Sequence, residues 1–60
     1  MPKFLIIYHM EDRCNSCTFT NSENASNFTK MLRDFGYNYE FYVYTDEHGF
    51  IRTSRWPAQI

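Results

Sequence analysis

The order of hydrophobic and polar positions first predicts a β-strand close to the start of the chain. Residues 3–10, KFLIIYHM, are rich in β-branched and aromatic side chains, and the polar stretch EDRCNS follows them. Apolar side chains occupy both faces of this strand, Leu5 and Ile7 on one and Phe4, Ile6 and Tyr8 on the other. A strand of this kind is typically covered on both sides.

A short second strand and an amphipathic helix are predicted next. Residues 17–20, CTFT, return as the second strand. Thr20 and Glu23 have the spacing of a capping box, with Ser22 as a competing N-cap. Gly36 stands where a left-handed residue would end the helix. The apolar face of the helix, with spacings of three and four, comprises Ala25, Phe28, Leu32 and Phe35.

The last part of the chain predicts a β-hairpin. Residues 37–45, YNYEFYVYT, alternate between two faces, and residues 50–56, FIRTSRW, form the final strand after the turn DEHG. A three-residue loop with Gly49 in a left-handed bulge position places Tyr44 opposite Arg52. A four-residue loop would shift the register by one and exchange the faces of the last strand. We favour the shorter loop because it buries the isoleucine of that strand with the aromatic residues.

These elements predict a single α+β domain over residues 1–60. The order β-β-α-β-β gives a small, mainly antiparallel sheet with one helix packed on one face, and residues 57–60 are expected to form a loose tail. A chain of 60 residues buries only about 60% of the surface that its unfolded form exposes. Such a domain usually needs additional support, which a disulfide, a metal or a partner subunit can supply.

One helix can cover only one face of the predicted sheet. That face is expected to carry Leu5, Ile7, Tyr39, Phe41, Val43 and Ile51, packed against Phe28, Leu32 and Phe35. Monomers rarely leave a large apolar patch exposed unless it binds something, and tyrosine and arginine are enriched where partners bind. The alternative is a curled sheet whose second face is covered by loops and the C-terminal tail. The candidate partner-binding residues are Phe4, Ile6, Tyr8, Tyr42, Tyr44, Arg52, Arg55 and Trp56.

The charge balance favours a protein partner over nucleic acid. Six Lys and Arg against seven Asp and Glu, with a pI near 6.0, lack the basic excess that phosphate binding requires. Aromatic and arginine side chains on an open sheet can nevertheless stack bases, so a nucleic-acid-binding domain is the alternative. Protein interfaces use the same residue types without a basic field.

The two cysteines raise a second alternative, a metal or thiol site. Cys14 and Cys17 have the spacing of half a zinc site, and His9 and His48 could complete a Cys2His2 set. Neither histidine has the spacing of a zinc motif, however. A redox pair would need the first cysteine at a helix N-terminus, and this pair precedes a strand. We therefore interpret both as loop thiols, with no cofactor.

No pattern in the chain indicates catalysis or membrane insertion. His48 lies in a turn without an oriented partner, and there is no nucleophile elbow or phosphate-binding glycine loop. The apolar stretch KFLIIY is far shorter than the roughly 20 residues of a membrane-spanning helix. We expect a cytoplasmic protein with reduced thiols that is not an enzyme.

In length and in its Asn/Tyr/Phe-rich composition, the chain resembles the small accessory proteins of bacteriophages. Many of these bind and block one host enzyme, which implies an inhibitor or adaptor acting in the host cytoplasm. The sequence thus predicts a small non-enzymatic protein-binding module, expected to form a homodimer, to bind a host enzyme, or both.

Overall fold

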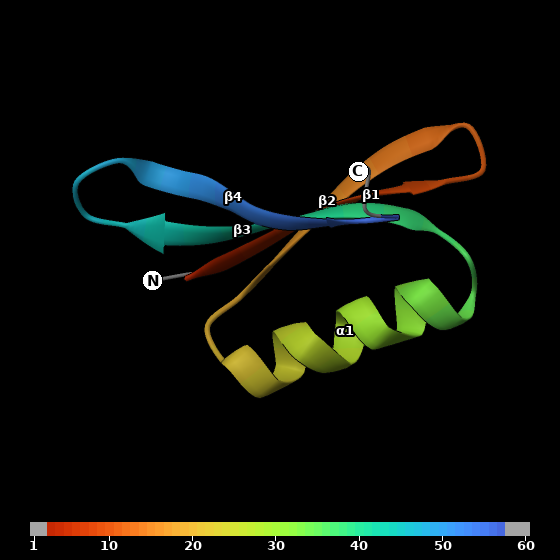
Figure 1. The fold of residues 1–60 in the computed structure, drawn as a ribbon, viewed down its shortest axis with the longest axis horizontal. Coiled ribbons are helices and arrows are strands. Elements are labelled where there is room, and N and C mark those ends of the chain that lie inside the picture. Colours follow the sequence, from red (N-terminus) through yellow and green to blue (C-terminus); the bar gives the residue numbers. More distant parts are fainter. Residues whose placement is uncertain (1–2, 58–60) are drawn as a thin grey trace.

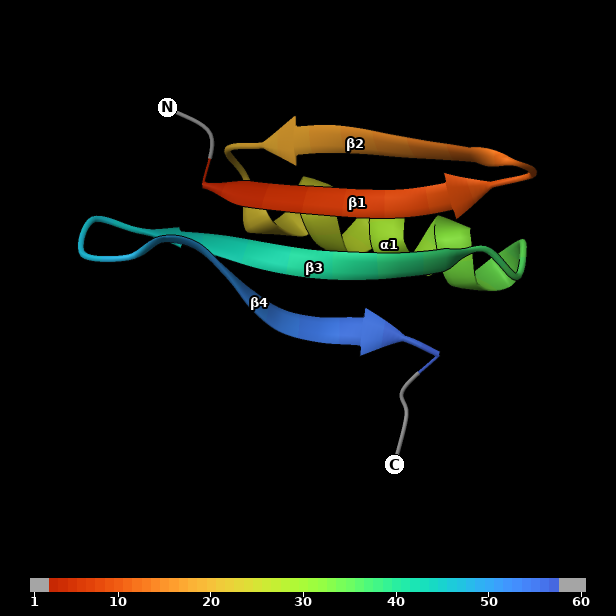
Figure 2. The same ribbon diagram turned by 90° about the horizontal axis from the view of Figure 1, so that it is seen from above.

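The computed structural model describes residues 3–57, which form a four-stranded antiparallel sheet with one helix on one side (Figure 1). The elements in chain order are β1 (Phe4–Met10), β2 (Arg13–Phe19), α1 (Ser22–Asp34), β3 (Asn38–Thr45) and β4 (Gly49–Trp56). The strand order is β2-β1-β3-β4, so the connection through α1 crosses β1, as Figure 2 shows. The α+β class and the order β-β-α-β-β are confirmed. Most of the predicted tail, residues 58–60, lies outside the described residues.

The second strand is longer than the sequence predicted. It begins at Arg13, which pairs with Met10 across a two-residue turn of Glu11 and Asp12. Glu11 has a φ of +56°, the left-handed conformation that tight hairpin turns require. The prediction that residues 13–16 form a loop was therefore wrong. An edge strand that is largely exposed to solvent needs no apolar alternation, so its polar residues concealed it.

Both ends of α1 are closed by hydrogen bonds. The side-chain oxygen of Asn21 accepts from the backbone N–H groups of Glu23 (2.8 Å) and Asn24 (3.2 Å), so Asn21 is the N-cap and the predicted capping box at residue 20 was wrong. At the other end Gly36, with a φ of +80°, ends the helix as predicted. The N–H of Tyr37 donates to the carbonyl of Leu32 at 2.9 Å, the long bond of a Schellman motif.

The core lies between α1 and the central strands. Ile6 is opposite Phe41, so the two share the face that α1 covers. Ile6, Ala25 and Leu32 are fully buried, and Tyr39 is 8% exposed. Around them pack Phe4, Tyr8, Phe19, Phe28, Tyr37, Phe41 and Trp56.

The face of β1 that meets the helix is the opposite of the predicted one. Phe28 of α1 lies 5.2 Å from the Tyr8 ring and 5.4 Å from the Phe19 ring, centroid to centroid. These contacts turn Leu5 and Ile7 away from the helix. Because β1 is apolar on both faces, only its register against the neighbouring strands decides the question, and a shift of one residue would exchange the faces.

Phe35 was also misplaced by the sequence prediction. It is the C-cap residue rather than part of the buried helix face, and 67% of its surface is exposed. Its ring lies 6.1 Å from that of Tyr37. The helix face that packs on the sheet therefore ends at Leu32.

The β3–β4 loop has the predicted length of three residues, but it comprises residues 46–48, one position earlier than predicted, so Gly49 belongs to β4 and the register differs. Thr45 pairs with Gly49, whose φ is +71°. Tyr44 is opposite Phe50, and Arg52 is opposite Tyr42 rather than Tyr44. The register shifts between residues 41 and 42, where Thr53 is an extra residue in β4, a β-bulge. The hydroxyl of Thr53 donates to the carbonyl of Phe41 at 3.3 Å.

The cap position gives a first prediction. Asn21→Ala should lower the free energy of unfolding by about 1 kcal/mol, because two backbone donors lose their acceptor. Thr20→Ala should change it by less than about 0.5 kcal/mol. Urea unfolding followed by circular dichroism measures both. A larger loss for Thr20→Ala than for Asn21→Ala would contradict the observed cap.

The orientation of β1 gives a second prediction. Ile6→Val should cost about 0.5–1.5 kcal/mol of stability, because it removes a methyl group from a fully buried site. Ile7→Val is the matched control on the other face and should cost less. Equal losses, or a larger loss at Ile7, would show that β1 is turned the other way.

Candidate functional site

The sheet face opposite α1, here called the open face, is covered by no element among residues 3–57 (Figures 1 and 2). The pairing between strands defines which residues share it. It carries Leu5, Ile7 and His9 of β1, Cys14, Ser16 and Thr18 of β2, Asn38, Glu40, Tyr42 and Tyr44 of β3, and Phe50, Arg52 and Arg55 of β4.

Across the open face, the chemistry changes in order from one edge of the sheet to the other. One row of paired residues runs Thr18, Leu5, Tyr42, Arg52, and the next runs Ser16, Ile7, Glu40, Arg55. Hydroxyl groups thus line the β2 edge, aliphatic side chains lie on β1, a phenol and a carboxylate lie on β3, and guanidinium groups line the β4 edge. This is an apolar centre with a polar rim, the arrangement typical of protein interfaces.

Hydrogen bonds to Glu40 hold the side chains of Tyr42 and Arg52 in place on the open face. The hydroxyl of Tyr42 donates to Oε1 of Glu40 at 3.1 Å, and Nη1 of Arg52 donates to Oε2 at 3.2 Å. Partial burial, the hydrogen bond to Glu40 and the charge of Glu40 raise the pKa of Tyr42 above its ordinary value near 10, against a smaller opposing effect of Arg52. At neutral pH the phenol is neutral and is held in place by the carboxylate.

A second aromatic group lies toward the β3–β4 turn. The rings of Tyr44 and Phe50 pack edge to face, with centroids 5.3 Å apart and planes at 72°. Phe50 is 38% exposed. The pair extends the apolar surface of the open face beyond the strand centre.

Four of the eight predicted partner-binding residues lie on the open face: Tyr42, Tyr44, Arg52 and Arg55. The other four were placed on the wrong side. Phe4, Ile6 and Tyr8 pack in the helix-side core because of the register of β1. Trp56 is opposite Tyr39 and stacks on it, with ring centroids 6.5 Å apart and planes at 16°, so it also belongs to the helix side.

Leu5, Ile7, Glu40 and Phe50 are among the residues of this face that were not predicted from the sequence. Leu5 and Ile7 were assigned to the helix side, and nothing in a strand apolar on both faces could have corrected that. Glu40 could have been found, because it alternates with Tyr42 and is the carboxylate nearest to it. Phe50 could also have been found, because it alternates with Arg52 on the turn side of the bulge.

The two cysteines do not form a joint site. Both lie in β2, three residues apart, so their side chains project from opposite faces of the strand. Cys14 is opposite His9 on the open face, and Cys17 is opposite Ile6 on the helix side. The prediction that both cysteines lie in a loop was wrong, because both lie in β2. The strand geometry also counts against one metal ion or one disulfide shared by both.

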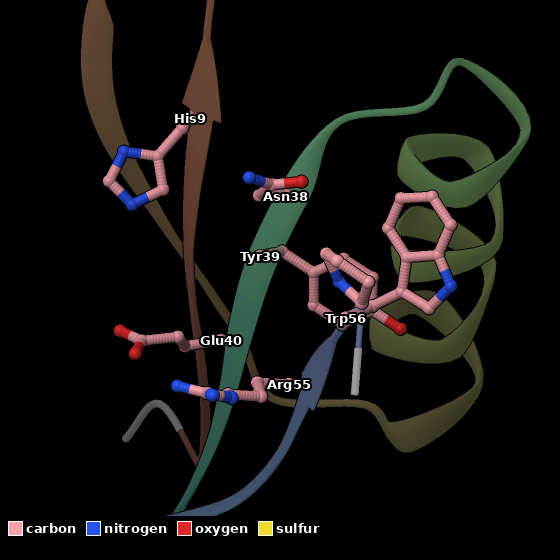
Figure 3. Close-up of a pocket in the computed structure, with 7 residues that line it drawn as sticks. His9, Asn38, Tyr39, Glu40, Arg55 and Trp56 are labelled. Atoms are coloured by element: carbon pink, nitrogen blue, oxygen red, sulfur yellow. The ribbon is translucent and has the colours of Figure 1, made fainter. Parts of the chain in front are cut away.

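A small pocket lies beside the open face where β4 ends (Figure 3). Its volume is about 180 Å³, below the range of about 300–1,000 Å³ that small-molecule sites usually have. In Figure 3 the side chains of Glu40 and Arg55 lie near each other, with His9 on the same side. The lining residues are His9, Asn38, Tyr39, Glu40, Arg55, Trp56 and Pro57. A pocket of this size and polarity suits one side chain of a binding partner.

The remaining titratable groups are dispersed over the described residues. His48 lies in the β3–β4 turn, mostly exposed, with Nε2 3.8 Å from a carboxylate oxygen of Glu47. Within residues 3–57, no three His, Cys, Asp or Glu side chains gather as a metal site would require. No helix in that part of the chain has the length and apolar character needed to cross a membrane.

Comparison of the chain with protein-family models, curated proteins and solved structures found no match.

The network around Glu40 gives a third prediction. Glu40→Gln should lower the pKa of Tyr42, because the variant loses the carboxylate whose hydrogen bond and charge favour the protonated phenol. The raised pKa means that the protonated phenol stabilises the folded state. This stabilisation is complete below pH 10 and is lost as the pH rises through the pKa of Tyr42 in the folded protein.

NMR titration of the Tyr42 ring carbons measures this change. Glu47→Gln in the distant turn removes the same charge and should leave the Tyr42 titration unchanged. An unchanged Tyr42 pKa in Glu40→Gln would mean that the hydrogen bond does not form in solution.

Proposed function

We propose that this protein is a small non-enzymatic protein-binding module that acts through the open face. One observation carries the proposal: Leu5, Ile7 and Tyr42, each half-buried by its neighbours in the sheet, form an apolar centre that no described element covers, beside charged residues on β4. Contiguous apolar patches of this kind mark interaction sites on soluble proteins.

The size of the open face supports this reading. The molecule measures 32 × 25 × 20 Å, and Figure 1, drawn down its shortest axis, shows the sheet edge-on along its longest axis. The open face therefore runs along the 32 Å length of the molecule.

The small core points in the same direction. Ile6 and Leu32 are the only large side chains that are fully buried among the described residues. A domain with so little buried apolar surface gains stability when a partner covers its other face. The occupant we propose is a protein, either a second copy of the chain or a foreign protein. A host enzyme, bound by a cytoplasmic inhibitor or adaptor as in the bacteriophage proteins that the chain resembles, is one such foreign protein.

Single-stranded nucleic acid is the second candidate ligand. Its support is the placement of Arg52 and Arg55 on the same face as the Tyr44–Phe50 pair, a combination of cations and aromatic rings that can bind phosphates and bases. It ranks lower because Leu5 and Ile7 at the centre are aliphatic and cannot stack on bases.

A photo-crosslinking experiment tests the proposal. The crosslinking amino acid p-benzoylphenylalanine replaces Ile7 on the open face, or Asn27 on the exposed side of α1 as the matched control, in cells of the native source. Position 7 should give a product of defined mass that contains a second protein, and position 27 should not. A product of twice the chain mass identifies a second copy as the occupant.

Two results would contradict protein binding. One is the absence of any protein product at position 7, with circular dichroism showing that the variant is folded. The other is a product that nuclease removes, which would establish the nucleic-acid candidate instead.

A further inference from the structure

The β-bulge in β4 determines where two guanidinium groups lie. Arg52 and Arg55 are three residues apart, and in a regular strand residues at an odd spacing project from opposite faces. Because Thr53 is the extra residue of the bulge, Arg52 is opposite Tyr42 and Arg55 is opposite Glu40, so both lie on the open face. The bulge thereby gathers positive charge on one side of the sheet.

The remaining charged residues increase the difference in net charge between the open face and the rest of the molecule. Lys3 precedes β1, and its carbonyl accepts from the N–H of Tyr44 at 2.8 Å, so it continues the pairing of β1 with β3. With Lys3, the open face has three cations and only Glu40 as an anion, a net charge of +2. The turns, the helix and the helix side of the sheet carry the remaining three cations and six carboxylates, a net charge of −3. The cations are Arg13, Lys30 and Arg33, and the carboxylates are Glu11, Asp12, Glu23, Asp34, Asp46 and Glu47.

This polarity discriminates between the possible occupants of the open face. Two copies packed face to face would bring two positively charged surfaces together, which electrostatic complementarity disfavours. A nucleic acid would match the charge but would leave the aliphatic centre of Leu5 and Ile7 without an apolar partner. A protein surface that is both apolar and acidic matches the charge and the centre together.

We infer that the open face binds an acidic, amphipathic protein segment, an inference that rests on the proposed protein-binding function. Apolar side chains of this segment cover Leu5 and Ile7, and its carboxylates lie along β4, where they meet Arg52 and Arg55. The pocket beside Arg55 takes one of its side chains.

A pair of designed peptides tests the inference. Each is an amphipathic helix-forming peptide of about 14 residues with leucines on one face; one carries glutamates on the other face, and its twin carries lysines there. An oligothymidylate is the third probe. Each is titrated into the ¹⁵N-labelled protein and followed by NMR. The glutamate peptide should shift the amides of Leu5, Ile7, Tyr42 and Arg52, with an affinity that falls as salt rises, and its lysine twin should not.

Charge-reversal variants supply the matched control. Arg52→Glu with Arg55→Glu should lower the affinity for the glutamate peptide by about tenfold or more. Lys30→Glu with Arg33→Glu makes the same charge change on exposed positions of α1 and should leave the affinity within about twofold, because charges a Debye length or more away are largely screened.

Other outcomes overturn the inference in distinguishable ways. Equal or tighter binding of the lysine twin at the open face would refute the acidic partner while leaving the protein-binding function in place. Stronger binding of oligothymidylate at the same amides would refute both. A dimer that protects these amides in the absence of peptide would identify a second copy instead. No shift with either peptide would refute the acidic amphipathic segment. The crosslinking experiment at Ile7 does not depend on the charge of the partner, so it would still test the protein-binding function independently.

Discussion

The register between β1 and β3 is the constraint on which the rest of this structure depends. Strand β1 is apolar on both faces, so its composition does not decide which face meets the helix. Pairing Ile6 with Phe41 puts Ile6 at the centre of the core and turns Leu5 and Ile7 outward. Shifting that pairing by one residue would bury Leu5 and Ile7 and place Phe4, Ile6 and Tyr8 on the open face instead.

The helix reinforces this choice of register. Phe28 lies against both Tyr8 and Phe19, so one helix side chain links the central strand to the edge strand β2. The helix is held at the required position by Asn21 at one end and by the left-handed Gly36 at the other. The molecule therefore has one well-covered face and one open face, and that asymmetry is the basis of the functional proposal.

Local signals in the sequence predicted most of the fold. The helical spacing of apolar residues identified the helix, the glycine at position 36 identified its end, and the alternation of residues 37–45 identified the third strand. Non-local features were not predictable. The N-cap was misassigned by one residue because Thr20, Asn21 and Ser22 are all good caps. Four of the eight predicted partner-binding residues were assigned to the wrong face. The register of a strand that is apolar on both faces cannot be read from its sequence, and no sequence motif marks the bulge at Thr53.

The most direct test of the account is the solvent accessibility of the β1 side chains in the isolated protein. A soluble nitroxide added to a methyl-labelled sample broadens NMR signals in proportion to their exposure. Leu5 and Ile7 are half-buried and Ile6 is fully buried beneath α1, so we expect clear broadening of the Leu5 and Ile7 methyl signals and almost none for Ile6. Broadening of Ile6 with protection of Ile7 would contradict it, because β1 would then present its other face to solvent.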